Sequence, residues 1–539
     1  MSTTLKTLPV EAKKRGGYRR LLLVTAVVIF GSVASWMIWG AVRDWADARA
    51  LEAYFAELEK REPGWQDRVY GKALTSAQMD DHQKWGELEQ AITANTAKWP
   101  VWMAYRQGLS TGMYQDPALP AAHFPPEQVE FLKAAHEYWQ PTLKKLSTQG
   151  KLPGQHRFLD RNASYEQMLI QASNQSSNAY LLNEGVEMEV MYYIMMNDAE
   201  QAFRWFSWRK PPTAFTLNAS PFLIERWLNL TQPQGATLLQ MQKALEGQSH
   251  WLEKYGLPGF GTDLRLLEKH IRELAHGELT SRQIDDMGEL YGFYSRDSAW
   301  KSSLLNWLRP YYVKYRLGNV FQRSNNIVLK LHQMADQVEG LAAVEPARQW
   351  ASWKSWAEAQ SILINRDQLY ARKTLPNYSD GIPEGLFLLR ARYAHSQVLS
   401  LFETEAQMRT ALAAVVAERF RVDQGRFPKD WAELVPKYID QPILDPFTGK
   451  PLMLKLNEKG IVIYSVGGQG KDEGGEKLNH NHYWNYGGKG WDVKNSNLGT
   501  RVLLPALRRG PAAALTDDQR QALTENTGEL LKLMKKGEK

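Results

Sequence analysis

Two groups of side chains have the atoms to bind a transition metal. Thioether sulfur is a ligand for copper(I), and four methionines lie close together, namely Met188, Met191, Met195 and Met196. Their spacing is also that of one face of a helix, and the residues between them are largely apolar or aromatic, so we predict that they pack in a core. His480 and His482 form the second group, where an exposed polar loop explains the pair without a metal.

The sequence lacks the common motifs of nucleophilic and metal-dependent catalysis. The other histidines stand singly, no H-E-x-x-H pair occurs, and there is neither a G-x-S-x-G elbow nor a Walker-type phosphate loop. Cysteine is absent, which excludes disulfides, zinc thiolates and a thiol nucleophile. The sequence therefore names no reaction and favours a non-enzymatic role.

The most apolar element is the uncharged run 21–42, bounded by Arg20 and Arg43. As a helix it reaches roughly 33 Å, enough to cross a hydrocarbon core of about 30 Å. A cleavable signal peptide would end at the small-x-small site 32–34, but the apolar character continues past that site to Trp39. We therefore predict a single transmembrane helix.

Basic residues flank this helix unequally. Arg43 and Arg49 follow it closely, whereas residues 1–20 contain Lys6, Lys13, Lys14, Arg15, Arg19 and Arg20. The excess of positive charge predicts that residues 1–20 are a cytoplasmic segment and that the bulk of the chain lies outside. The expected location is the cytoplasmic (inner) membrane, with the lipid bilayer as a partner.

The rest of the 539-residue chain has a globular composition. Its apolar content of 43% and aromatic content of 11% are ample for packed cores. The net charge is +7, but much of the basic excess lies in residues 1–20. Nucleic acid is therefore not an expected partner.

Residues 43–385 have apolar and aromatic side chains at helical spacing, interrupted by clusters of Pro, Gly or Asn and without a fixed repeat. We predict a large, irregular α-helical extracytoplasmic domain, in which 178–209 is one of the expected helices. Asn229-Leu230-Thr231 has the form of a glycosylation sequon, as do several other N-x-[ST] triplets at about chance frequency.

The pattern changes after Gly385. Residues 386–424 contain neither Gly nor Pro, which predicts one helix roughly 58 Å long. Two strand-like runs follow at 452–456 and 460–466, and then a glycine-rich loop begins. We predict a small α+β module over 386–494 with an antiparallel sheet. Residues 495–539 are predicted to be a helical tail, whose amphipathic helix begins at Thr516. The expected fold class is mainly α.

The motifs of this module follow a recognisable order. They are D-x-G-R-F-P at 423–428, L-V-P at 434–436, D-P-F-T-G-K-P-L at 445–452, and Y-S-V-G at 464–467 before a Gly/Asp loop. This order resembles the C-terminal globular half of type II secretion major pseudopilins, over about residues 403–494. It is also similar to related modules at the ends of other bacterial envelope proteins.

The chain departs from a pseudopilin near its N-terminus. Gly16-Gly17-Tyr18 has neither the processing site nor the following glutamate of those proteins, and a whole helical domain separates the membrane helix from the module. The resemblance therefore implies a pseudopilin-like module in a different protein, and not a subunit that polymerises in the usual way.

The resemblance also implies a calcium site. In these pseudopilins the loop after Y-S-x-G holds one Ca²⁺ through aspartates and backbone carbonyls. Here Gln469 stands at the first aspartate position, and Asp472, Glu473 and Asp492 remain as candidate ligands. A glycine-rich turn with solvated acids explains the same residues, so both interpretations stay open.

Two classes of function fit these features. The first is a membrane-anchored extracytoplasmic structural or interaction protein of the bacterial envelope, linked to secretion through its module and bound to other envelope proteins. The second is an envelope enzyme that acts on a glycan or peptide in a cleft of the helical domain, which would need two carboxylates about 5 to 10 Å apart. No paired-acid or metal motif occurs in the sequence, which favours the first class. The sequence specifies no substrate and no oligomeric state.

Overall fold

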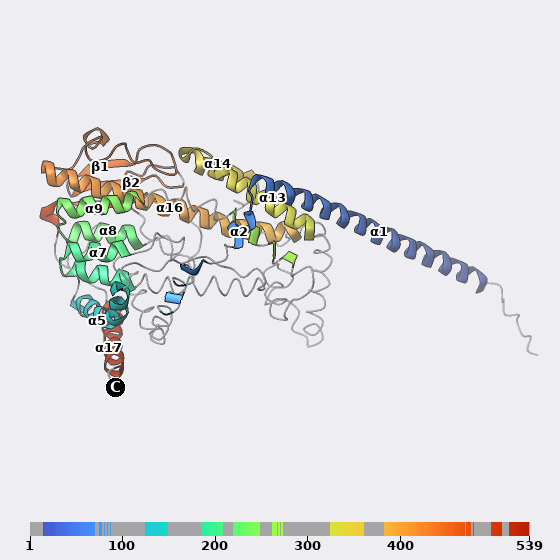
Figure 1. Ribbon diagram of the computed structural model, residues 1–539, viewed down its shortest axis with the longest axis horizontal. Helices are drawn as coiled ribbons and strands as arrows, with labels where there is room; N and C mark the ends of the chain where they lie inside the picture. The colour runs from blue at the N-terminus through green and yellow to red at the C-terminus, as the bar shows by residue number, and fades with distance from the viewer. Residues whose placement is uncertain are drawn as a thin grey trace, which may run out of the picture. The chain divides into compact units, whose positions relative to one another are not determined.

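The computed structural model is mainly helical, with one small antiparallel sheet, as predicted (Figure 1). Contacts within the chain define two units, one from Met1–Trp65 and Leu267–Gln333, the other from Gln66–Leu266 and Met334–Lys539. The residues that the structure describes, apart from isolated positions between them, are 15–70, 126–148, 185–208, 219–247, 324–359, 382–468, 470–475, 497–508 and 517–537.

Helix α1 (Arg15–Arg61) contains the predicted apolar run and continues well beyond it without a break. It is long and apolar enough to cross a membrane. Its described large apolar side chains between Leu23 and Val42 are exposed, as expected for a surface that faces lipid and not a protein core. The helix ends before Gly64, which has a positive φ of 72° and donates its N–H to Glu59.

The other described helices vary in length. They are α2 (Trp65–Tyr70), α5 (Pro126–Thr148), α7 (Ala199–Trp208), α8 (Ala219–Leu230), α9 (Gly235–Glu246), α13 (Ser324–Ala342), α14 (Pro346–Ala359), α16 (Ile382–Gln424) and α17 (Asp517–Gly537), with short 3₁₀ helices at η2 (Trp431–Glu433) and η4 (Pro505–Leu507). The helix predicted over 386–424 is α16, and the last predicted helix is α17.

The prediction of one helix over 178–209 was wrong. The chain is helical over 185–195 and again from Ala199, but Asn197 between them has a φ of 60°. Asparagine tolerates this left-handed conformation, and the side chain of Asp198 then accepts the N–H of Gln201 at 3.0 Å and caps α7.

The prediction that the methionine group packs in a core is confirmed for three of its members, of which Met195 is partly buried and packs against the core. Met188 and Met191 are buried within the hydrophobic core. Met196 is 55% exposed, because it lies in the turn that interrupts the helix.

Helix α16 is the central element of the second unit. Residues 401–418 are buried on every side of the helix, and α8, α9 and the sheet pack against it (Figure 1). One hydrophobic core joins side chains of α5, α7, α8, α9, α16 and the sheet. The predicted boundary between 43–385 and 386–494 stays a prediction; the observed core contains residues from both ranges.

The sheet has the order β1 (Met453–Asn457), β2 (Gly460–Ser465) and β3 (Leu498–Leu503), with every pair antiparallel. Ile461, Ile463 and Val502 belong to the core shared with α16. Val462 and Tyr464 point to the other face, which we call the outer face of the sheet, and pack there with Leu478.

Strand β3 was not predicted, because its residues were assigned to the helical tail. Side chains on both faces of β3 are buried, so the sequence lacks the alternation of apolar and polar residues that marks a half-buried strand.

The burial of α16 should make stability depend on pH. Burial raises the pKa of Glu403 from 4.5 to about 8. Between these values the folded protein keeps a proton that the unfolded chain releases, so stability should fall as pH rises from about 4.5 to about 8. Urea denaturation across this range should show a smaller slope for Glu403→Gln, which should be the more stable protein near the upper limit.

Glu458→Gln is the matched control, because Glu458 is exposed in the hairpin between β1 and β2. It should keep the wild-type dependence on pH. If Glu403→Gln also keeps the wild-type dependence of stability on pH, Glu403 is not its cause.

Candidate functional site

The glycine-rich loop 467–475 lies over the outer face of the sheet. Gly475 has a φ of 67°, and a Cβ atom there would lie 2.7 Å from the ring of Tyr464, so only glycine fits without displacement. Lys455 of β1 donates from Nζ to the carbonyl of Gly474 at 2.9 Å. At the start of the loop, Trp350 donates from Nε1 to the carbonyl of Gly468 at 3.3 Å. The loop is therefore fixed at both ends.

Asn497 holds the middle of this loop. Its side chain is fully buried, and Oδ1 accepts the N–H groups of Glu473 and Gly475, each at 3.1 Å. Its Nδ2 donates to the carbonyl of Lys471 at 3.1 Å. One amide thus satisfies three backbone groups of the loop. Sequence reasoning missed this residue, because a single asparagine carries no motif.

The structure describes two of the three candidate calcium ligands, Asp472 and Glu473, and gives them different partners. Asp472 Oδ1 accepts from the hydroxyl of Tyr464 at 3.0 Å and from the N–H of Gly474 at 2.7 Å. Burial, together with the hydrogen bond to Asp472, raises the pKa of Tyr464 to about 12. The adjacent Glu473 lies 3.9 Å from Lys471, measured from Oε1 to Nζ.

The third candidate, Asp492, lies outside the described residues, as do Gln469, His480 and His482. Within the part of the chain that the structure describes, no group of three His, Asp or Glu side chains is arranged to hold a metal. Asp472 is exposed, and its hydrogen bonds from Tyr464 and Gly474 are both to Oδ1. The calcium site stays a prediction.

The D-P-F-T-G motif has a structural role in this protein. Asp445 is buried, and its Oδ1 accepts from the N–H of Phe447 and the hydroxyl of Ser465, both at 2.9 Å. Its Oδ2 accepts the N–H of Val466 at 3.1 Å. Burial raises the pKa of Asp445, although these hydrogen bonds and the charge of Arg409 act in the opposite direction. The carboxyl group joins the turn before the sheet to the end of β2.

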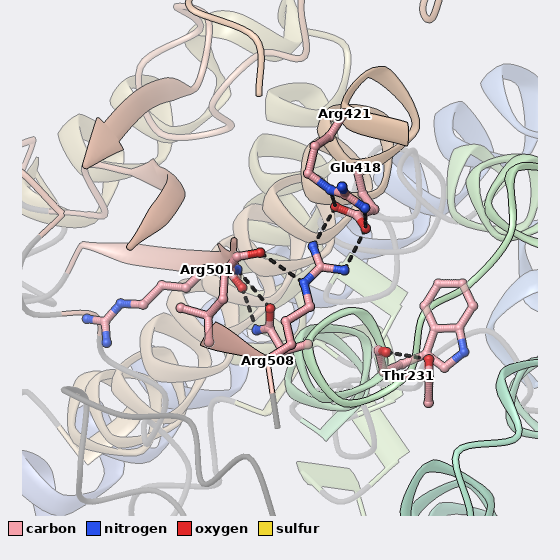
Figure 2. Close-up of polar contacts among 8 residues, drawn as sticks. Thr231, Glu418, Arg421, Arg501 and Arg508 are labelled. Atoms are coloured by element: carbon pink, nitrogen blue, oxygen red, sulfur yellow. Dashed lines mark hydrogen bonds and ion pairs between the residues drawn. The ribbon is translucent and has the colours of Figure 1, made fainter. Parts of the chain in front are cut away.

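A buried cluster of charges joins α16 to the segment after β3 (Figure 2). Glu418 is 1% exposed and accepts two hydrogen bonds from Arg508, both at 2.7 Å, and two from Arg421, both at 2.8 Å. Arg508 also donates from Nε to the carbonyl of Leu503 at 2.9 Å. Such bidentate pairs between charged groups are strong and fix geometry.

Helix α8 covers the outer edge of β3. Asn229 donates from Nδ2 to the carbonyl of Arg501, and its Oδ1 accepts the N–H of Leu503, both at 2.9 Å. Glu225 accepts the N–H of Arg501 at 3.1 Å. These contacts satisfy backbone groups that would otherwise be open to another strand.

The same contacts explain the Asn229-Leu230-Thr231 sequon. Asn229 is 1% exposed, and the buried Thr231 donates from Oγ1 to the carbonyl of Trp227 at 2.6 Å (Figure 2). The triplet is therefore structural, and a glycan would not fit at Asn229.

Two histidine–carboxylate pairs are formed by residues outside 386–494. In the first unit, Nε2 of the fully buried His332 is 2.9 Å from Glu268, within a cluster of rings formed by Tyr54, Phe55 and Trp65. Burial acts to raise the pKa of Glu268, but His332 and Arg272 lower it overall. In the second unit, Nδ1 of His136 is 2.8 Å from the buried Glu189. Each pair links neighbouring helices, which fits a role in packing.

Comparison with known proteins finds no matching family, no similar curated protein and no similar solved structure. The described polar side chains of the second unit that are fully buried mostly bind the chain's own backbone or one another. Asp445, Asn497 and Glu418 are the main examples. We therefore interpret these buried polar groups as the means by which the loop and sheet are held.

The charge cluster gives a sharp stability prediction. Glu418→Ala would leave the buried guanidinium group of Arg508 without its carboxylate partner, which should cost about 3 to 5 kcal/mol of unfolding free energy, measured with urea. The double variant Glu418→Leu/Arg508→Met removes the buried pair together and leaves only the partly exposed Arg421, so it should recover much of that loss.

Glu130→Ala is a control, because it breaks the exposed Lys133–Glu130 pair on α5 and should change stability far less. A Glu418→Ala variant as stable as this control would show that the cluster does not hold α16 to the segment after β3.

The calcium prediction can be tested by thermal melting with calcium and with a chelator. With a dissociation constant near 0.1 mM, about 2 mM calcium should stabilise the fold by roughly 1.8 kcal/mol. Asp472→Asn keeps the acceptor for Tyr464 but removes the charge, so it should abolish the shift, and Asp492→Asn should do the same. His480→Ala should preserve it. Identical melting curves for the wild type in both conditions would leave the loop as a glycine-rich turn.

Proposed function

We propose that the protein is a single-pass, membrane-anchored structural or interaction protein of the bacterial envelope. The observation that carries this proposal is α1, whose described large apolar side chains from Leu23 to Val42 are exposed and which then continues directly into the first packed unit. Exposed apolar surface of this length is unfavourable in water and favourable in lipid. The basic segment 1–20 supports a cytoplasmic N-terminus, with the bulk of the chain outside the inner membrane.

The contacts of the buried ionisable groups support a structural role over an enzymatic one. Glu418 binds two arginines, and Asp445 binds three groups of the adjoining chain. These carboxylates hold helices, turns and strands together, and their acceptor oxygens are already occupied by protein donors.

We further propose that the module over 386–494 is the recognition element for other envelope proteins. Its resemblance to pseudopilins supports a link to secretion, and the loop with Asp472 and Glu473 is the proposed calcium-binding part. The fixed loop 467–475 on the outer face of the sheet supports this role, because a rigid loop can present side chains to a partner with little loss of entropy.

The proposal predicts one topology. Alkaline phosphatase fused after Lys539 should be active only outside the cytoplasm, and the full chain should remain in the membrane pellet after alkaline washing. A chain that begins at Arg43 behind a cleavable signal should leave the pellet under the same wash. If the expressed full chain is instead recovered in the soluble fraction without its first 34 residues, it has been cleaved as a signal peptide, and the anchor is contradicted.

A further inference from the structure

Two tryptophan–arginine pairs lie where the apolar part of α1 ends. The guanidinium carbon of Arg43 is 4.8 Å from the ring centroid of Trp39, and that of Arg49 is 4.6 Å from the ring centroid of Trp45. Trp39 is 58% exposed and Trp45 is 59% exposed. Among the described residues, neither arginine has an acidic partner. Each pair therefore presents a cation on an exposed aromatic ring.

The heights of the two pairs match the headgroup layer of a bilayer. Trp39 lies near the end of the uncharged run, and Arg43 is about 6 Å further along the helix axis. Counted from Val42, where the uncharged run ends, Trp45 is about 4.5 Å and Arg49 about 10.5 Å further along the axis, and the guanidinium of Arg49 lies over the ring of Trp45. The headgroup layer on one side of a bilayer is roughly 5 to 8 Å thick. The first pair thus falls within this layer and the second falls at its outer limit.

The directions of the two pairs exclude one small ligand. Six residues along an α-helix correspond to a rotation of about 240°, so Trp39 and Trp45 lie on different sides of α1. Side chains on different sides and at different heights cannot converge on a single anion. A layer of headgroups that surrounds the helix can contact both pairs.

Packing of the first unit begins at the same height. From Leu23 to Trp39 the described side chains of α1 are exposed, but Asp47 is half-buried and Leu51 is buried. Asn326 of α13 donates from Nδ2 to Asp47 at 3.2 Å. No spacer therefore separates the apolar run from the packed part of α1.

We propose that Trp39–Arg43 and Trp45–Arg49 bind the phospholipid headgroups of the outer leaflet and hold the first unit against the bilayer surface. This inference rests on the proposed membrane anchor. The arginines donate to lipid phosphates, which match the geometry of a guanidinium group, and the indole rings lie at the boundary with the hydrocarbon.

The absence of cysteine allows a direct test with single spin labels. Ala46→Cys and Ala56→Cys place labels on exposed positions of α1, roughly 15 Å apart along its axis. The labelled full chain is reconstituted into phospholipid vesicles that contain a nickel-chelating lipid. We expect strong paramagnetic relaxation of the label at residue 46 and little at residue 56.

The arginines are then tested in the Ala46→Cys background. Because the apolar run itself keeps residue 46 near the bilayer, Arg43→Gln/Arg49→Gln should lower the relaxation in part, through loss of the headgroup contact, whereas the control Lys60→Gln/Arg61→Gln, further along the same helix, should keep the wild-type value. Adding inorganic phosphate to the buffer should not change the relaxation of the label at residue 46. A loss of relaxation would show that the arginines bind free phosphate in preference to lipid headgroups, and it would overturn the inference.

The outcomes separate the inference from the anchor on which it rests. Protein that floats with the vesicles but shows equal relaxation at residues 46 and 56, or no response to Arg43→Gln/Arg49→Gln, overturns the headgroup contact alone. Protein that does not float with the vesicles overturns the membrane anchor and the headgroup contact together.

Discussion

Burial of residues 401–418 of α16 on every side obliges the polar side chains of this stretch to find partners inside the protein. Glu418 meets Arg508 and Arg421, and Thr410 meets the hydroxyl of Thr500 at 3.1 Å. Because an unpaired buried polar group is costly, these partners must keep their positions whenever α16 is folded. The positions of β3 and of the segment after it are therefore coupled to one helix.

Two neutral amide side chains also pair buried backbone groups. Asn229 satisfies the edge of β3 from α8, and Asn497 satisfies the glycine-rich loop from the position before β3. An amide has both donors and an acceptor, so a single side chain can bridge backbone groups of opposite polarity without introducing a charge. This chemistry explains why much of the polar interior consists of contacts to the backbone.

The elements that the sequence predicts best have a simple compositional cause. The apolar run of α1 lacks charges, and α16 lacks glycine and proline over most of its length, so both helices were predictable. The break at Asn197 was not, because asparagine occurs inside many helices and only its φ of 60° marks the turn. Strand β3 was not predicted because both of its faces are buried.

The candidate site was likewise predictable only in part. The glycines and acids of the loop mark it in the sequence, but the residues that hold it do so through tertiary contacts. The contact between Asn229 and Arg501 joins positions that are 272 residues apart, and Asn497 binds the loop from beyond residues 479–496. Such pairings leave no local pattern, so a single sequence does not reveal them.

In the membrane-anchored protein that we propose, the unbroken helix α1 would couple the thickness of the bilayer to the position of the first unit. A membrane helix accommodates a thinner bilayer by tilting, and tilts of about 20° are common. From Arg43 to Arg61 the helix extends roughly 27 Å beyond the apolar run, so such a tilt moves its end sideways by about 9 Å. Because the helix is unbroken, the side chains packed around Leu51 and Leu58 would move together with its end. Lipid composition would thereby set where the first unit lies above the membrane.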